Sequence, residues 1–88
     1  MAEKAGSTVS RTAFSIFLAH RRHQVKLTQR GLAKALSMNR DEAITQTKIH
    51  GWECGARAPH ARYLMQLFDI LRLSREDEKL ALILLAQT

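Results

Sequence analysis

The chain has 88 residues, enough for one domain with a modest hydrophobic core but not for two. Apolar residues make up 45% of it, which excludes a disordered composition, and the longest apolar run, residues 80–86, is far too short to span a bilayer. The single cysteine, Cys54, excludes an internal disulfide bond. Because no apolar signal segment precedes the domain either, we expect a cytoplasmic protein.

The excess positive charge lies in the first 60 residues. The formal net charge is +6, and residues 4–40 carry eight Lys or Arg residues and no acidic residue. Residues 61–88 carry four basic and four acidic residues. Such a distribution attracts a polyanion, either nucleic acid or an anionic membrane surface, although a basic face can also serve only to keep a protein soluble.

The apolar spacing predicts an all-α fold without strands. Residues 1–9 are expected to form a flexible tail, and residues 10–88 a single domain of about five helices. Ser10 is the expected N-cap of a helix over residues 11–23, whose apolar face would comprise Phe14, Phe17 and Leu18, with Ile16 a further candidate. Thr28 is expected to cap a second helix, with its buried face formed by Leu32, Ala33, Ala35 and Leu36.

Three more helices are expected after a polar turn or short loop, Ser37–Ala43. Thr45 would cap a third helix over residues 46–53, with Ile49 and Trp52 facing inward and Gly55 following its end. Pro59 marks a break before a fourth helix over residues 61–71, which would bury Leu64, Leu67, Phe68 and Leu71. Ser74 and Asp77 form a variant capping box for a fifth helix over residues 75–86.

The second and third predicted helices suit DNA recognition. The major groove of B-DNA admits one α-helix, which enters by its N-terminal end, so exposed side chains of its first turns meet the base edges. In the helix over residues 46–53, the exposed polar positions would be Gln46, Thr47 and His50. These positions are therefore the candidate base-reading residues, although polar side chains at a helix start can also be merely solvated.

Three sequence blocks carry a family resemblance over about half of the chain. They are LTQxxLAxxL at residues 27–36, ITQTKIxxWExGxRxP at residues 44–59 and LxxLxxxL at residues 64–71. In this order they resemble the lambda-repressor-like helix-turn-helix family. The resemblance implies a five-helix DNA-binding domain in which Gln29 holds a phosphate and braces Gln46, Gln46 and Thr47 read bases, and Arg57 touches a phosphate or a base edge.

The resemblance also implies a buried ion pair between Arg22 of the first helix and Glu53 of the third. Two departures from the family pattern stand out. Eight residues, Ser37–Ile44, occupy the turn where the family usually has two, and Gly51 stands where a long polar residue is common. We further expect phosphate contacts from several basic residues: Arg21, Arg30, Lys34, Arg40, Lys48 and Arg57. For Lys48, plain solvation is an equal alternative.

The residue spacing predicts neither a metal site nor an active site. His50, Cys54 and His60 supply three candidate ligands where structural zinc takes four, so we expect no metal and no other cofactor. There is no phosphate-binding glycine-rich loop, catalytic triad context or facing carboxylate pair, so we expect no enzyme.

The run Leu80–Ala86 is apolar around nearly the whole circumference of a helix, more than this small chain can cover. We assign Leu80, Ile83 and Leu84 to the core face, and Leu82, Leu85 and Ala86 to a dimer interface. The expected function is that of a homodimeric transcriptional regulator, a repressor on a palindromic operator. The alternatives are an antitoxin-like or other protein-interaction module, which would use the Ser37–Ala43 loop or the last helix, and, with less support, a single-stranded RNA-binding protein.

Overall fold

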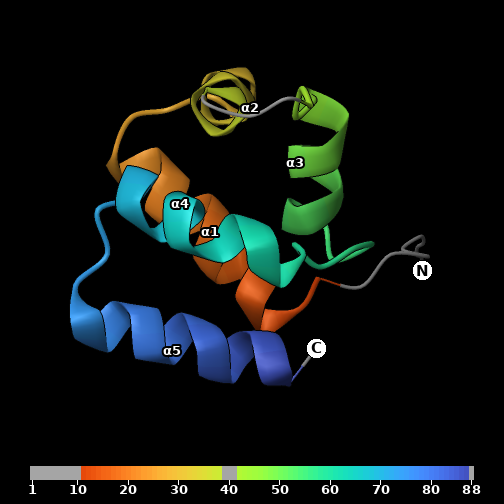
Figure 1. The fold of residues 1–88 in the computed structure, drawn as a ribbon. Coiled ribbons are helices and arrows are strands. Elements are labelled where there is room, and N and C mark those ends of the chain that lie inside the picture. Colours follow the sequence, from red (N-terminus) through yellow and green to blue (C-terminus); the bar gives the residue numbers. More distant parts are fainter. Residues whose placement is uncertain (1–10, 39–41, 88) are drawn as a thin grey trace.

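The computed structural model describes residues 11–38 and 42–87, and within these ranges it contains five helices and no strand (Figure 1). The all-α prediction is therefore confirmed. The expected tail over residues 1–9 lies outside the described residues. The helices are α1 (Ala13–Gln24), α2 (Gln29–Ser37), α3 (Gln46–Glu53), α4 (Ala61–Ile70) and α5 (Arg75–Ala86).

Helices α1 and α4 lie between the α2–α3 pair and α5 (Figure 1). The packing follows this order, because α2 contacts α3 and α4, whereas α1 contacts both α3 and α5. None of the helices in the described part of the chain has the length and apolar character needed to cross a membrane.

One hydrophobic core joins all five helices. Its largest side chains come from α1, α2, α3 and α4, and α5 contributes Ala81. The rings of Trp52 and Tyr63 lie 5.7 Å apart between their centroids, which links α3 to α4. The aromatic side chains Phe14, Trp52, Tyr63 and Phe68 are buried and Phe17 packs against them, so these rings are unavailable for stacking on bases.

The first helix begins two residues later than predicted. Its N-cap is Thr12, whose hydroxyl accepts a hydrogen bond from the Ser15 N–H at 3.0 Å, while the Ser15 hydroxyl accepts one from the Thr12 N–H at 2.9 Å. The predicted cap, Ser10, lies outside the described residues. Thr12 is the better cap because Ser15, three residues later, completes a reciprocal capping box. Ile16, a candidate for the buried face, is exposed.

The other helix starts agree with the sequence. Thr28, Thr45 and Ser74 cap α2, α3 and α5 through their hydroxyl groups. Gly55 has a φ of 85° just after α3, the conformation that glycine adopts most readily at a helix end.

The rotation of α5 differs from the prediction. Its buried residue is Ala81, with Leu84 and Leu85 packed against the core, whereas Leu80 and Ile83 are 43% and 56% exposed. Leu80 and Ile83 were therefore wrongly assigned to the core, and Leu85 wrongly to the outer surface.

A polar contact between α1 and α5 agrees with this rotation. The Arg21 guanidinium donates to the Asp77 carboxylate at 2.9 Å, which turns Asp77 toward α1. Residues four, seven and eight positions after Asp77 lie on the same face of α5 as Asp77 does. Ala81, Leu84 and Leu85 consequently point inward.

The inserted turn is held at both ends. The Ser37 hydroxyl donates to the Ala33 carbonyl at 2.8 Å and accepts from the Ile44 N–H at 2.7 Å, which closes the two ends of the turn together. The Gln66 amide of α4 donates to the carbonyls of Ala35 and Met38, both at 3.3 Å. The longer turn thus leaves α2 and α3 packed against each other, with Ile44 buried between them and the core.

Candidate nucleic-acid interface

Helix α3 divides cleanly into a buried and an exposed face. Ile49 and Trp52 are buried, as predicted, and Glu53 is buried beside them. Gln46, Thr47 and His50 are exposed on the other face. The sequence-predicted base-reading residues therefore lie together on one surface.

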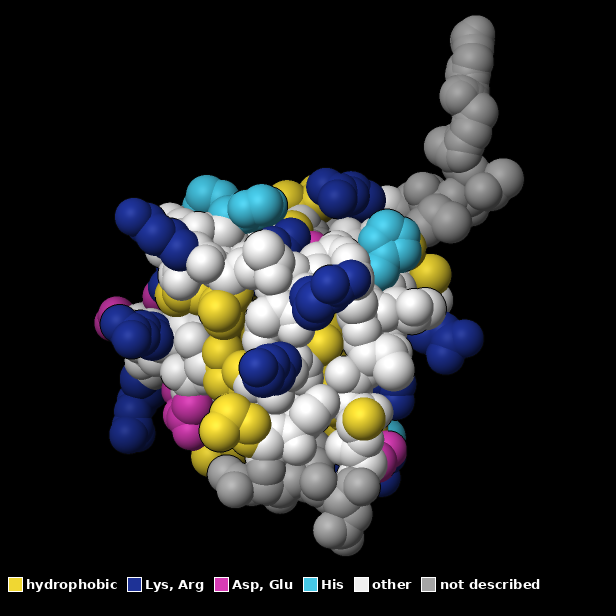
Figure 2. Space-filling view, turned by 90° about the horizontal axis from the view of Figure 1, so that it is seen from above, with side chains coloured by type: hydrophobic (Ala, Val, Ile, Leu, Met, Phe, Trp, Pro, Cys, Tyr) yellow, Lys and Arg dark blue, Asp and Glu magenta, His cyan; other side chains and the backbone are white. Residues whose placement is uncertain are grey.

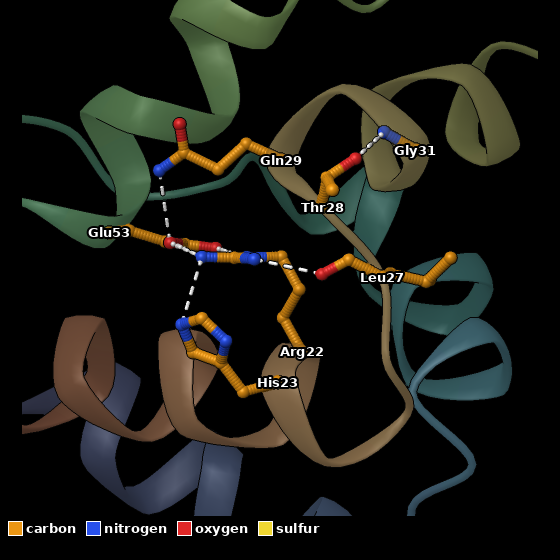
Figure 3. Close-up of polar contacts among 7 residues, drawn as sticks. All are labelled: Arg22, His23, Leu27, Thr28, Gln29, Gly31 and Glu53. Atoms are coloured by element: carbon orange, nitrogen blue, oxygen red, sulfur yellow. Dashed lines mark hydrogen bonds and ion pairs between the residues drawn. The ribbon is translucent and has the colours of Figure 1, made fainter.

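A buried ion pair fixes the position of α3. Arg22 Nε donates to Glu53 Oε2 at 2.6 Å and Arg22 Nη2 donates to Glu53 Oε1 at 2.9 Å (Figure 3). The third donor, Arg22 Nη1, reaches the Leu27 carbonyl at 2.8 Å. The side chains of Arg22 and Glu53 are only 8% and 3% exposed, so the predicted pair is present and desolvated. It joins α1 to α3 and to the segment before α2.

Gln29 occupies a different position from the one that the family resemblance implies. Its Nε2 donates to Glu53 Oε1 at 3.1 Å, so it braces Glu53 and not Gln46 (Figure 3). The carboxylate of Glu53 is the stronger acceptor, because a charged partner makes a stronger hydrogen bond than an amide does. Gln29 and Gln46 nevertheless line one depression of about 380 Å³ together with Arg22, Thr28 and Arg30, here called the α2 depression.

The start of α2 gives this depression donors for an anion. Thr28 caps the helix by accepting from the Gly31 N–H at 2.9 Å, and the preceding backbone N–H groups of Gln29 and Arg30 have no partner within the helix. The exposed Arg30 guanidinium adds a full positive charge. Backbone donors at a helix start next to a cation are the chemistry that binds phosphate.

A second basic depression lies on the opposite flank of α3. It has a volume of about 200 Å³ and is here called the α4 depression, lined by Lys48, Trp52, Arg57, Ala58, His60, Arg62 and Tyr63. Lys48 Nζ lies 5.6 Å and Arg62 Cζ 5.0 Å from the centre of the Tyr63 ring. Lys48 is therefore held over an aromatic ring, which orients its charge at the surface.

Glu42 ties this depression to the inserted turn. The Tyr63 hydroxyl donates to Glu42 Oε1 at 3.1 Å, and Arg62 Nη2 lies 3.1 Å from the same oxygen. The hydrogen bond with Tyr63 and the attraction of Glu42 raise the pKa of the Arg62 guanidinium above its ordinary value. The sequence did not predict that Arg62, Tyr63 and His60 belong to this interface, because their position next to α3 depends on how α4 packs.

Gly51 makes room for Arg57. A Cβ at Gly51 would lie 3.5 Å from Arg57 Cδ, so the aliphatic part of Arg57 lies directly on this glycine. The N–H groups of Ala56 and Arg57 both donate to the Gly51 carbonyl at 3.1 Å, which folds the chain back over the end of α3. This turn thus brings an exposed arginine onto the surface of α3, against Gly51.

The remaining predicted phosphate contacts fall in different places. Arg30 and Lys34 are exposed on α2, whereas Arg21 is paired with Asp77 of α5. Arg40 lies outside the described residues. Figure 2, which looks down on α2 and α3, shows Lys, Arg and His side chains across this face and Asp and Glu mainly near its edge. Among the described residues, no group of three or more His, Cys, Asp or Glu side chains is arranged to hold a metal ion.

Two short packed helices, the second of which exposes polar side chains between two cationic depressions, define a helix-turn-helix module. Comparison with protein families agrees, because the helix-turn-helix domain family matches residues 13–81. This match covers more than half of the chain, and the chain belongs to that family, which indicates a DNA-binding regulator. No curated protein and no solved structure matches the chain significantly.

Proposed function

We propose that this protein binds double-stranded DNA by placing the N-terminal half of α3 in the major groove. The observation that carries the proposal is the exposed set Gln46, Thr47 and His50 on a helix whose other face is locked by the Arg22–Glu53 pair. The amide of Gln46 has the donor and acceptor needed to pair with adenine N6 and N7. Specificity would therefore come from this one helical face.

Affinity would come from the phosphate backbone on either side of the groove. The α2 depression offers Arg30 and the start of α2, and the α4 depression offers Lys48 and Arg57. The two depressions flank α3, as the two strands flank a helix seated in the major groove. Cations that neutralise phosphates gain affinity by releasing counterions, so binding should weaken steeply with salt.

We also propose that the protein acts as a homodimer on a palindromic operator and represses transcription by occupying it. The support is the outer face of α5, where Leu80, Leu82 and Ile83 are exposed together and Ala86 continues the surface. A two-fold dimer would cover each patch with the same patch of a second copy, and it would repeat the α3 surface for a second half-site. Binding would be the whole activity, without catalysis.

An antitoxin-like role is the second candidate, and the same α5 face is the observation that favours it. A partner protein could cover Leu80, Leu82 and Ile83 in place of a second copy. The two candidates differ in the symmetry that they impose on the DNA, because a homodimer demands an inverted repeat.

Selection of bound duplexes from a random library tests these proposals together. We expect an enriched inverted repeat with half-site centres roughly 34–36 Å apart, or a multiple of that distance. A single unrepeated site would contradict the homodimer, and the absence of any enriched sequence would contradict specific DNA binding. Gln46→Ala in the same selection should relax one position per half-site, whereas the control Arg72→Gln, in the turn between α4 and α5, should return the wild-type sequence.

A further inference from the structure

We infer that a notch between α1 and α3 binds one additional DNA backbone phosphate and does so more tightly when its histidines are protonated. The inference rests on the proposed function and adds a contact to it. The notch has a volume of about 360 Å³, and its polar walls include Arg11, His20 and His23 from the α1 side and His50 from α3. The Arg22–Glu53 pair also lines it, and the whole depression is called the histidine notch below.

The charges that face the histidine notch are unbalanced in favour of an anion. Glu53 is the acidic side chain in its lining, and its carboxylate is already bound by Arg22 and by the Gln29 amide. Cys54, also in the lining, donates its thiol hydrogen to the Gly51 carbonyl at 3.7 Å and adds no charge in that state. Among the described residues that line the notch, Arg11 is therefore a cation without an acidic counterpart, and each protonated histidine adds another.

The three histidines have different neighbours. His23 Nε2 lies 3.5 Å from Arg22 Nη2, so this nitrogen can accept from the guanidinium, and a proton placed on it would face a neighbouring cation (Figure 3). His20 and His50 are exposed and come from α1 and α3, on the two walls of the notch. An anion between them would be attracted by a protonated imidazole on either wall.

The position of the histidine notch identifies DNA as the source of that anion. The notch shares Arg22 and Gln29 with the α2 depression, and His50 belongs to the exposed face of α3. The backbone of a DNA strand that passes the α2 depression can thus continue past this notch. A backbone phosphate would meet Arg11, His20 and His50 from two helices, whereas a free phosphate ion would gain nothing from this continuity.

Proton uptake on binding gives the notch a measurable signature. Histidine side chains ordinarily gain their charge between pH 8 and pH 5, so acidification should strengthen DNA binding. One proton taken up per bound protomer changes affinity by at most about tenfold per pH unit. Partial protonation of the free protein reduces this, so we expect about three- to tenfold tighter binding at pH 6 than at pH 8. One more phosphate contact should also steepen the slope of log K against log salt by about 0.9.

The experiment measures the affinity of a selected duplex by fluorescence anisotropy at pH 8 and pH 6 over a series of chloride concentrations. His20→Gln should lose most of the gain in affinity and slope that the wild type shows when the pH falls from 8 to 6. His20→Arg carries a permanent charge, and it should bind more tightly at pH 8 and respond less to acid. Thermal unfolding at both pH values checks that the variants remain folded.

His60→Gln is the matched control, because His60 lies in the α4 depression on the other flank of α3. This variant should keep the acid response whatever its affinity. The inference is wrong if wild-type affinity is the same at the two pH values, if His20→Gln responds fully, or if the response is lost in His60→Gln instead. It is also wrong if inorganic phosphate at constant ionic strength abolishes the response, since the notch would then hold the free ion. Duplex binding at pH 8 tests the proposed function separately, and its absence would refute both.

Discussion

Arg22 and Glu53 form a two-point ion pair across the interface of α1 and α3, with Nε–Oε2 and Nη2–Oε1 distances of 2.6 and 2.9 Å. Each member is almost completely buried, and the remaining Arg22 nitrogen is bound by the Leu27 carbonyl. The pair therefore sets the position of the recognition surface of α3 from its buried side.

Removing one member of this pair should destabilise the fold. Glu53→Ala leaves the Arg22 guanidinium buried without its counter-charge, and breaking a buried pair in this way costs about 3–5 kcal/mol. For a domain of this size, the melting temperature should fall by more than about 10 °C. Thermal unfolding followed by circular dichroism measures it. Asp69→Ala, an exposed carboxylate on α4, is the control and should melt within a few degrees of the wild type.

An unchanged melting temperature in Glu53→Ala would mean that the pair contributes nothing to the fold. The double variant Arg22→Met with Glu53→Leu removes both charges together. It should be less destabilised than the sum of the two single variants, because no unpaired charge remains.

The sequence predicts the parts of this structure that depend on local chemistry. Thr28 and Thr45 precede periodic apolar residues, and each caps a helix where expected. The exposed face of α3 follows from the inward spacing of Ile49 and Trp52. The Arg22–Glu53 pair was implied by family resemblance alone.

Other features depend on tertiary contacts that the sequence pattern does not contain. Seven consecutive apolar residues have no periodicity, so they do not show which face of α5 is buried; that face is set by packing against the core, and the Arg21–Asp77 contact with α1 agrees with it. Gln29 binds Glu53 in place of Gln46 because folding brings the Glu53 carboxylate within 3.1 Å of Gln29 Nε2. The contact of Arg57 with Gly51 depends on the turn at Gly55, which reverses the chain after α3.

Gln46 should read a base. Its exposed amide lies in the first turn of α3, and a bidentate amide–adenine contact contributes about 1–3 kcal/mol of discrimination. In competition binding against duplexes that differ at single positions, Gln46→Ala should lose this discrimination at one position per half-site. A variant that still discriminates at every position would show that Gln46 is not a base reader.

Lys48 should contact a phosphate. Its ammonium group is held over the Tyr63 ring beside Arg57, so it is oriented before DNA arrives. Lys48→Ala should weaken binding to all duplexes and reduce the slope of log K against log salt by about one unit. Arg72→Gln removes an exposed charge from the turn between α4 and α5, outside both depressions, and should leave the slope unchanged. Equal slopes for Lys48→Ala and the wild type would show that Lys48 is solvated and does not contact a phosphate.

Gly51 tests whether the placement of Arg57 matters. A methyl group would meet Arg57 Cδ at 3.5 Å, an ordinary contact, and alanine favours the helix by about 1 kcal/mol over glycine. Gly51→Ala should therefore melt higher and retain DNA affinity. Gly51→Leu would extend into the position of the Arg57 side chain and displace it, so it should weaken DNA binding while the protein stays folded. If Gly51→Leu bound DNA as tightly as Gly51→Ala, the position of Arg57 would be irrelevant to binding.

The outer face of α5 should hold two copies of the chain together. Leu80 and Ile83 are 43% and 56% exposed, so Leu80→Glu with Ile83→Glu adds charge at the surface without entering the core. In a dimer this variant would bury unpaired carboxylates, and it should sediment as a monomer with normal helix content and much weaker operator binding. Met65→Glu is the matched control, because Met65 is an exposed apolar residue on α4 and should leave association unchanged. A wild-type protein that remains monomeric at high concentration, both free and on DNA, would refute the homodimer and leave this face for a partner protein.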